Sequence, residues 1–95
     1  MNNLTIRRAT AADEFAVRRL SALDSAFPPT GDVLLAEMDD QLWAALSLDS
    51  GHAVADPFRP SGELVDLLRF RAESLAAEAA PRRGRVLARV LPRAA

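Results

Sequence analysis

Two side chains that are able to move a proton, His52 and Asp56, flank a short apolar stretch in the middle of the chain. Acyl transfer to an amine needs a general base and an acid for the leaving group. Neither residue has a Ser, Tyr or Cys partner at a meaningful spacing. A His beside Gly51 is typical of a solvated loop, and an Asp before Pro57 is typical of a turn. The sequence therefore assigns no catalytic residue.

The stretch DPFRPSGEL, residues 56–64, joins this apolar run to a helix-like run. The first amides of a helix have no partner within it, so we expect Ser61, Gly62 and Glu63 to present outward donors. Such amides, together with the helix dipole, favour an anion. Pro60 removes one donor and Glu63 adds a negative charge, so any anion binding should be weak.

Two further features have both a chemical and a structural interpretation. Trp43 has the side chain to line a ligand groove, but a Trp in an apolar strand is usually packed or half-buried. The carboxylates of Asp39 and Asp40 are ligands of the kind that Ca²⁺ takes. Adjacent residues in a tight turn diverge, however, and no third ligand is near. We expect packing for Trp43, a hairpin turn for the aspartates, and no metal site.

Apolar periodicity predicts the elements that must position these residues. They are strands at 4–9, 33–38, 41–48 and 52–55, and helices at 11–26 and 61–80. Thr10 and Asp13 have capping-box spacing at the start of the first helix. A meander followed by a helix that crosses back predicts an α/β fold of the α+β kind. Its sheet should be mixed but mainly antiparallel, with two main helices.

The apolar faces of these elements predict the core. On the first helix the expected face is Ala12, Ala16, Leu20, Leu23 and Phe27, and on the second it is Leu64, Leu67, Leu68, Ala72 and Leu75. The expected core is Leu20, Leu23, Leu35, Leu46, Val54, Leu64, Leu68 and Leu75.

Composition and charge limit the classes of function. The 95 residues suffice for one small domain, and the absence of Cys excludes disulfides and cysteine nucleophiles. No apolar run is long enough to cross a bilayer, and the N-terminus has no signal-peptide core, so we expect a cytoplasmic location. Residues 1–80 carry 7 Arg and 13 acids, whereas residues 81–95 carry 5 Arg and no acid. We therefore divide the chain into a domain, 1–80, and a basic tail, 81–95.

The element order and three stretches of sequence resemble the N-terminal half of the GNAT acetyltransferase superfamily. These stretches are LTIRRATAADEFAVRRL, AEMDDQLWAAL and HAVADPFRPSGELVDLLR. In that family the fourth strand leads into a turn of the form Arg/Gln-x-x-Gly-x-Gly/Ala, whose amides bind the pyrophosphate of acetyl-CoA. Arg59 and Gly62 match the first two key positions, and Leu64 stands where the family has a small residue.

The resemblance implies acetyl-CoA or CoA as a ligand, with Val54, Ala55, Arg59, Ser61 and Gly62 as the binding residues. It also implies what is missing. The later half of the family fold supplies the other wall of the CoA cleft and a tyrosine that acts as general acid, and this chain has no Tyr. We therefore expect a catalytically silent half-GNAT-like module that binds CoA or a small anion weakly, or that dimerises.

Two other functions stay open. One is an N-acetyltransferase whose active site is completed by a dimer mate. The other is an adaptor whose residues 81–95 dock on nucleic acid or anionic lipid. That tail reads as a basic amphipathic helix, a further strand after the second helix, or a frayed terminus. We expect a homodimer that covers the edge of the strand at 52–56, because an unpaired edge invites a partner.

Overall fold

A computed structural model describes residues 3–79 of the chain. Its elements are β1 (Leu4–Arg8), the 3-10 turn η1 (Ala11–Asp13), α1 (Glu14–Leu23), β2 (Val33–Met38), β3 (Gln41–Ser47), β4 (Ala53–Ala55) and α2 (Gly62–Ala79). The strands form one sheet in the order β1-β2-β3-β4, and each neighbouring pair is antiparallel. The predicted α+β class is confirmed. The predicted basic tail, residues 81–95, lies outside the described residues.

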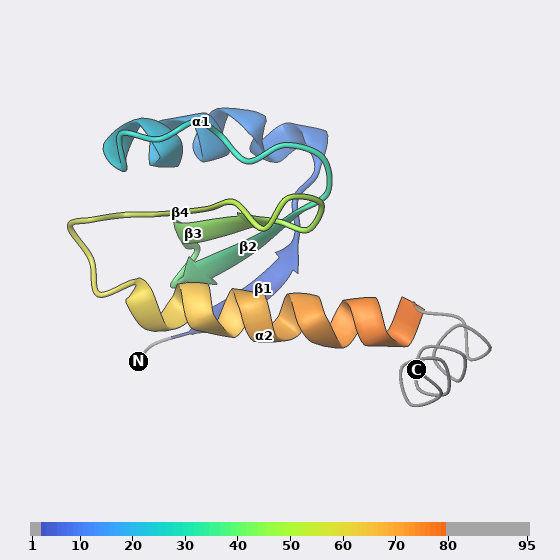
Figure 1. The fold of residues 1–95 in the computed structure, drawn as a ribbon. Helices are drawn as coiled ribbons and strands as arrows, with labels where there is room; N and C mark the ends of the chain where they lie inside the picture. The colour runs from blue at the N-terminus through green and yellow to red at the C-terminus, as the bar shows by residue number, and fades with distance from the viewer. Residues whose placement is uncertain (1–2, 80–95) are drawn as a thin grey trace, which may run out of the picture.

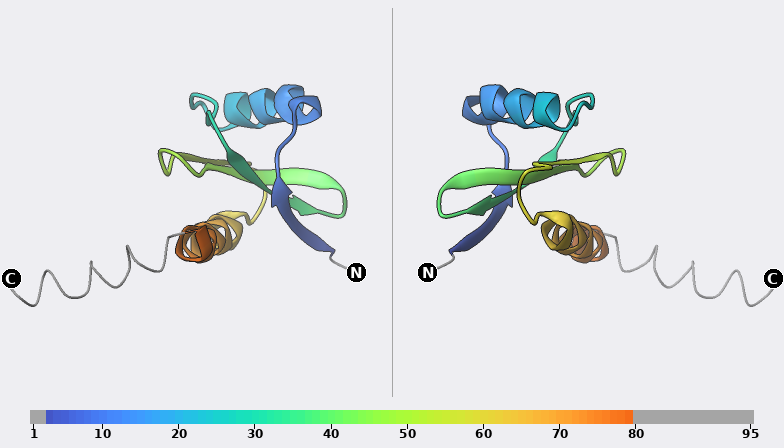
Figure 2. Two further views of the ribbon diagram at one scale, coloured as in Figure 1. Left: turned by 90° about the vertical axis from the view of Figure 1, so that its right-hand side faces the viewer. Right: turned by 90° about the vertical axis from the view of Figure 1, so that its left-hand side faces the viewer.

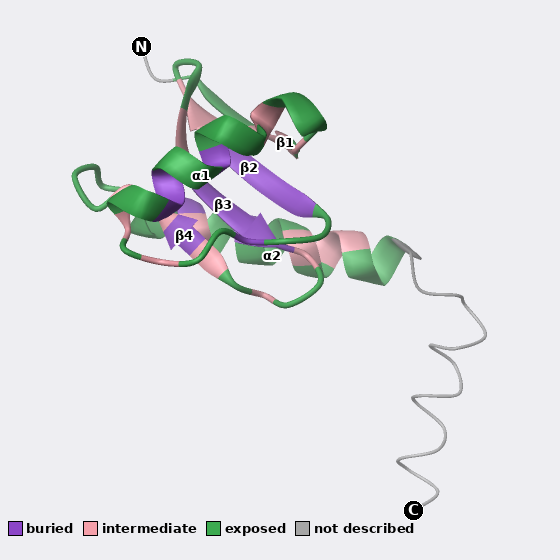
Figure 3. Ribbon diagram, turned by 90° about the horizontal axis from the view of Figure 1, so that it is seen from above, coloured by how far each residue is buried: buried purple, intermediate pink, exposed green. Residues whose placement is uncertain are grey.

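The sheet is a middle layer, with α1 on one face and α2 on the other (Figure 1, Figure 2). Because side chains alternate between the faces of a strand, the sheet contributes to two cores. The α1-side core is Val17, Leu20, Val33, Leu35, Ala45 and Val54, and the α2-side core is Leu34, Ala36, Ala44, Leu46, Leu64 and Leu68. Seen from above, α1 crosses the buried strands β2 and β3 and turns an exposed surface outward (Figure 3).

Most of the predicted core is confirmed; two of its leucines are corrected, and so is a third leucine on the expected face of the second helix. Leu23 is 44% exposed, because it ends α1 beside an open pocket. Leu75 is only half-buried, because the C-terminal part of α2 extends past the sheet (Figure 1). Leu67, expected on the buried face of this helix, is 42% exposed. The other six predicted core residues are buried.

The helix α1 is shorter than predicted. It ends at Leu23, after which Ser25 adopts a φ of 52°. The amide of Ser25 donates to the carbonyl of Ala22, and the amide of Ala26 donates to that of Ser21. These two bonds form a Schellman ending, which usually has Gly in the left-handed position. A Ser there gave no sequence signal for the end of the helix.

The buried face of α1 also differs from the prediction. It consists of Val17, Leu20 and Ser21, whereas the expected Ala12 and Ala16 are exposed. Phe27, which comes after the helix has ended, is 86% exposed.

The hairpin between β2 and β3 turns at Asp39 and Asp40, as predicted. Their φ angles of 52° and 68° are those of a two-residue type I′ turn, a conformation that Asp tolerates. The register shifts between Ala36 and Glu37, which leaves Trp43 as a bulge residue without a partner in β2. Trp43 is half-buried, and its carbonyl accepts the amide of Asp56 at 2.9 Å. The bulge therefore lies directly beside the exit of β4.

Candidate functional site

The turn between β4 and α2 is held by hydrogen bonds within itself. The Asp56 carboxylate accepts the Phe58 amide at 2.8 Å, and the Ser61 hydroxyl donates to the Asp56 carbonyl at 2.8 Å. The Ser61 amide donates to the Arg59 carbonyl, also at 2.8 Å. Ser61 is only 4% exposed. Its side chain therefore stabilises the turn, and Asp56 has the turn role that the sequence predicts.

The first amides of α2 differ from the expectation at one position. The Ser61 amide was expected to face outward, and this is wrong, since it is bonded inside the turn. The amides of Gly62 and Glu63 have no hydrogen-bond partner within residues 3–79. A Cβ built on Gly62 would meet no atom within 4 Å. The start of α2 thus has two unpartnered donors, and the space beside the Cα of Gly62 is open.

The strand residues of the expected CoA site, Val54 and Ala55, already have structural contacts. Val54 is 1% exposed and belongs to the α1-side core. The amide of Ala55 points away from β3 and donates to the Asp24 carboxylate at 3.0 Å. Asp24 directly follows α1, so the end of this helix covers part of the outer edge of β4.

Arg59 lies over the indole of Trp43. Its guanidinium carbon is 5.1 Å from the ring centroid, a distance at which the ring quadrupole attracts a cation. Its Nε is 3.7 Å from Asp56 Oδ2, and 44% of its side chain is exposed. The guanidinium is therefore oriented by the ring and still accessible to a solute.

A pocket of about 300 Å³ opens beside this stack, between α1, the start of β3 and the turn after β4. It is lined by Ala16, Arg19, Leu20, Leu23, Gln41, Leu42, Trp43, Asp56 and Arg59, and we call it the Trp43 pocket. Arg19 makes no hydrogen bond or ion pair in the part of the chain that is described. The buried Nε1 of Trp43 has no partner there either. The pocket thus combines apolar walls with two guanidinium groups and one carboxylate.

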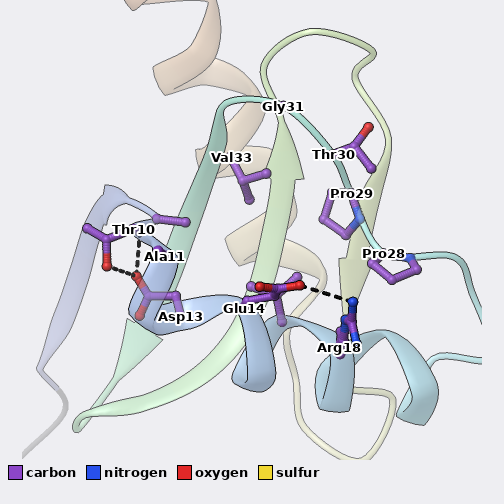
Figure 4. Close-up of a pocket in the computed structure, with 12 residues that line it drawn as sticks. Thr10, Ala11, Asp13, Glu14, Arg18, Pro28, Pro29, Thr30, Gly31 and Val33 are labelled. Carbon is purple, nitrogen blue, oxygen red and sulfur yellow. Dashed lines mark hydrogen bonds and ion pairs between the residues drawn. The ribbon is translucent and has the colours of Figure 1, made fainter.

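A second pocket, of about 470 Å³, lies at the start of α1. It is lined by Ala9, Thr10, Ala11, Asp13, Glu14, Val17, Arg18, Pro28, Pro29, Thr30, Gly31 and Val33, and we call it the proline pocket. Figure 4 shows Thr10 and Asp13 on one side and Pro28, Pro29 and Thr30 on the other. No residue of the predicted site lines it.

The charged groups of the proline pocket are paired with one another or with β1. The Asp13 carboxylate accepts hydrogen bonds from both terminal nitrogens of Arg7, at 2.8 and 2.9 Å, and from the amide of Thr10, at 2.7 Å. The hydrogen bonds from Arg7 and Thr10 hold the pKa of the Asp13 carboxyl well below its usual range. Glu14 pairs with Arg18 at 3.0 Å, as the dashed line in Figure 4 marks. This pocket offers space but no unpaired charge.

The two base candidates, His52 and Asp56, lie just outside opposite ends of β4. The Nε2 of His52 is 2.7 Å from the carbonyl of Phe27, and because a carbonyl only accepts, this nitrogen carries the proton. Asp56 accepts the Phe58 amide and faces Arg59. Both side chains thus have structural partners.

Comparison of the chain with protein-family models, with curated proteins and with solved structures found no match. No helix within residues 3–79 is long and apolar enough to cross a membrane. In the same residues, no group of three or more His, Asp or Glu side chains is arranged to hold a metal ion.

Sequence reasoning missed Arg19 as a candidate binding residue, although a signal was present. Arg18 has Glu14 one turn before it on the helix, and the two pair. Arg19 has Phe15 and Leu23 at the corresponding positions, so no acid on α1 neutralises it. An arginine that lacks an i±4 acid and lies next to an apolar helix face is the pattern that marks this pocket.

Proposed function

We propose that the protein is a catalytically silent binding or dimerisation module, similar in element order to the N-terminal half of a GNAT fold, with a weak anion site at the start of α2. The observation that carries the anion site is the pair of unpartnered amides at Gly62 and Glu63, with open space in front of Gly62. A helix N-terminus with free amides favours an anion such as the pyrophosphate of CoA.

The positions of the base candidates support a silent module. His52 and Asp56 lie just outside opposite ends of β4, and each side chain has a structural hydrogen bond, His52 to Phe27 and Asp56 to Phe58. The chain also has no Tyr to act as the general acid of the family. The negative side chain of Glu63, in the first turn of α2, is expected to keep anion binding weak.

The geometry of β4 supports the dimerisation part of the proposal. This strand is the last in the sheet order, and its register turns the backbone groups of Ala53 and Ala55 away from β3. Asp24 occupies the Ala55 amide, and the other outward groups have no partner within residues 3–79. An unpaired edge favours a second copy. Light scattering that gives a monomer at tens of micromolar, roughly where weak dimers assemble, would contradict this part.

Gly62→Asp tests the anion site, because an acidic residue suits the first turn of a helix but repels an anion. CoA should raise the melting temperature of the wild-type protein and leave that of Gly62→Asp unchanged. Incubation with acetyl-CoA and assorted amines should release no free thiol above background. Turnover that Gly62→Asp abolishes would instead favour the enzyme completed by a dimer mate. An equal CoA response in both proteins would place CoA elsewhere.

A further inference from the structure

The Trp43 pocket is separate from the amides of α2, and it supports an inference of its own. We propose that this pocket binds a small organic carboxylate that carries a short aliphatic chain. Arg19 and Arg59 would hold the carboxylate, and the apolar wall of α1 and β3 would take the chain.

The charges of the pocket favour a single negative charge in the ligand. Arg19 comes from α1 and Arg59 from the turn after β4, so two cations from elements that are far apart in sequence line the same pocket. Asp56 offsets one of them, at 3.7 Å from Arg59. One positive charge remains, and one carboxylate balances it. The planar guanidinium fork matches a carboxylate through two parallel hydrogen bonds.

The apolar part of the pocket favours a hydrocarbon chain. Leu20, Leu23 and Leu42 line it, and Leu23 keeps 44% of its surface exposed although it belongs to a helix packed on the sheet. Covering that surface would be favourable by the hydrophobic effect. The volume of about 300 Å³ lies at the lower end of small-molecule sites, which suits a short chain rather than CoA.

Comparison with the proline pocket shows why we choose the Trp43 pocket by its unpaired charge and not by its volume. It is larger, about 470 Å³, but its carboxylates and its arginine are already paired. A charged ligand there would have to displace an existing ion pair. In the Trp43 pocket, Arg19 has no partner to displace in the described part of the chain.

The experiment uses Trp43 as the reporter, since it is the only Trp in the chain. Hexanoate is titrated into the full chain at constant ionic strength, and indole fluorescence is followed. We expect a saturable change with a dissociation constant on the order of 1 mM. Hexylammonium tests whether the ligand must be negatively charged, and acetate tests whether its aliphatic chain contributes to binding. Hexylammonium should give no saturable change, and acetate should bind at least about fivefold more weakly.

Arg19→Gln and Arg18→Gln form the matched pair of variants. Both remove one exposed charge from α1, and Arg18 does not line the Trp43 pocket. Arg19→Gln should weaken hexanoate binding about tenfold, as expected for loss of a charge-assisted hydrogen bond. Arg18→Gln should change it by less than about twofold. Circular dichroism spectra and melting temperatures confirm that both variants stay folded.

The proposal is wrong if hexanoate gives no saturable change up to about 20 mM, or if hexylammonium binds as well. Equal weakening by the two variants would also overturn it, because a general loss of positive charge would then explain the result. Gly62→Asp should leave hexanoate binding within about twofold of wild type, whatever it does to CoA. Failure of the anion site at α2 is therefore distinguishable from failure of this one.

Discussion

The two faces of the sheet are covered in different ways. On one face the 18-residue helix α2 buries Leu64 and Leu68 against the strands, with Leu75 half-buried beyond them. On the other, the 10-residue helix α1 buries only Val17, Leu20 and Ser21. Both described pockets flank α1. A short helix over a wide sheet leaves space at each end of the helix. The two pockets that could hold a ligand lie in that space.

The two ends of α1 then differ in how their charges are paired. At its start, Arg7 joins Asp13 to Glu37 in a network of four hydrogen bonds at 2.8 to 3.1 Å. At its end, Arg19 has no partner in the described residues and Arg59 has a long one at 3.7 Å. The first arrangement stabilises the junction between β1 and α1. The second leaves positive charge available to a ligand.

The largest effect is expected on the well-covered face. Leu68→Ala removes a side chain that is 0% exposed between α2 and the sheet, where the surroundings have little room to collapse. The free energy of unfolding should fall by about 3–5 kcal/mol, in the upper part of the range for such truncations. Urea unfolding measures it. A loss below about 1 kcal/mol would show that Leu68 is not a core residue.

Leu20→Ala is the matching truncation on the α1 face, and its effect should be smaller. Leu20 is also buried, at 3% exposure, but it lines the Trp43 pocket. Its removal enlarges a space that is already open to solvent, so the truncation avoids most of the free-energy cost of leaving a closed cavity. We expect a loss of about 2 kcal/mol in the same urea experiment. A loss equal to that of Leu68→Ala would mean that the two faces are packed alike.

Sequence patterns predicted this fold well where a pattern has one physical cause. The strand Val33–Met38 and the Asp39–Asp40 turn follow from β propensity and from the ability of Asp to adopt positive φ. The end of α1 was missed because its left-handed residue is Ser25 and not Gly. Leu23 was placed in the core because helical period shows which residues share a face, but not where a neighbouring element stops.

The candidate site was less predictable, because it depends on contacts between distant elements. The hydrogen bond from the Ala55 amide to the Asp24 carboxylate joins residues 31 positions apart, and no local sequence pattern predicts it. The resemblance assigned Arg59 to CoA binding, but no local pattern showed that its guanidinium lies over Trp43, the bulge residue of β3. Residue types indicated an anion site near β4. The Trp43 pocket was missed, because the lack of an i±4 acid at Arg19 does not show that β3 and the turn after β4 line a pocket with it.

Removing the bond between Asp24 and the edge of β4 should have a moderate effect. Asp24→Ala leaves the Ala55 amide without its acceptor, and we expect a loss of about 1–2 kcal/mol. Hydrogen exchange at that amide should accelerate. Asp66→Ala is the control, because Asp66 is exposed and has no partner within residues 3–79. Equal losses for both variants would mean that the bond contributes nothing specific.

The network at the start of α1 should give a smaller, pH-dependent effect. Hydrogen bonds from Arg7 lower the pKa of Asp13 in the folded protein. The ionised carboxylate therefore contributes its full stabilisation of the fold above about pH 5, and this stabilisation is lost as the pH falls below the ordinary Asp pKa. Because Arg7 keeps 38% of its side chain exposed, Asp13→Asn should cost about 1 kcal/mol or less at pH 7.

Urea unfolding at several pH values measures the difference between wild type and Asp13→Asn. It should shrink towards zero in acid, because the wild-type carboxylate is then protonated in both states. Asp66→Asn again serves as the control and should show no such convergence, since no residue in the described range pairs with Asp66. A difference that stays constant down to about pH 3 would contradict the pairing.

The smallest effect is expected at Gly62, and it separates a helix start from a binding site. The backbone there does not have the positive φ that requires Gly, and a Cβ would meet no atom within 4 Å. Gly62→Ala should therefore stabilise the fold slightly, by about 0.4–1 kcal/mol, because Ala lowers the conformational entropy of the unfolded chain. A CoA pyrophosphate at the neighbouring amides would occupy that same open space, so the added methyl should weaken CoA binding. Stabilisation with unchanged CoA binding would show that Gly62 only begins the helix. Stabilisation with weaker binding is the result expected of a site, because the fold does not need Gly62 but the ligand does.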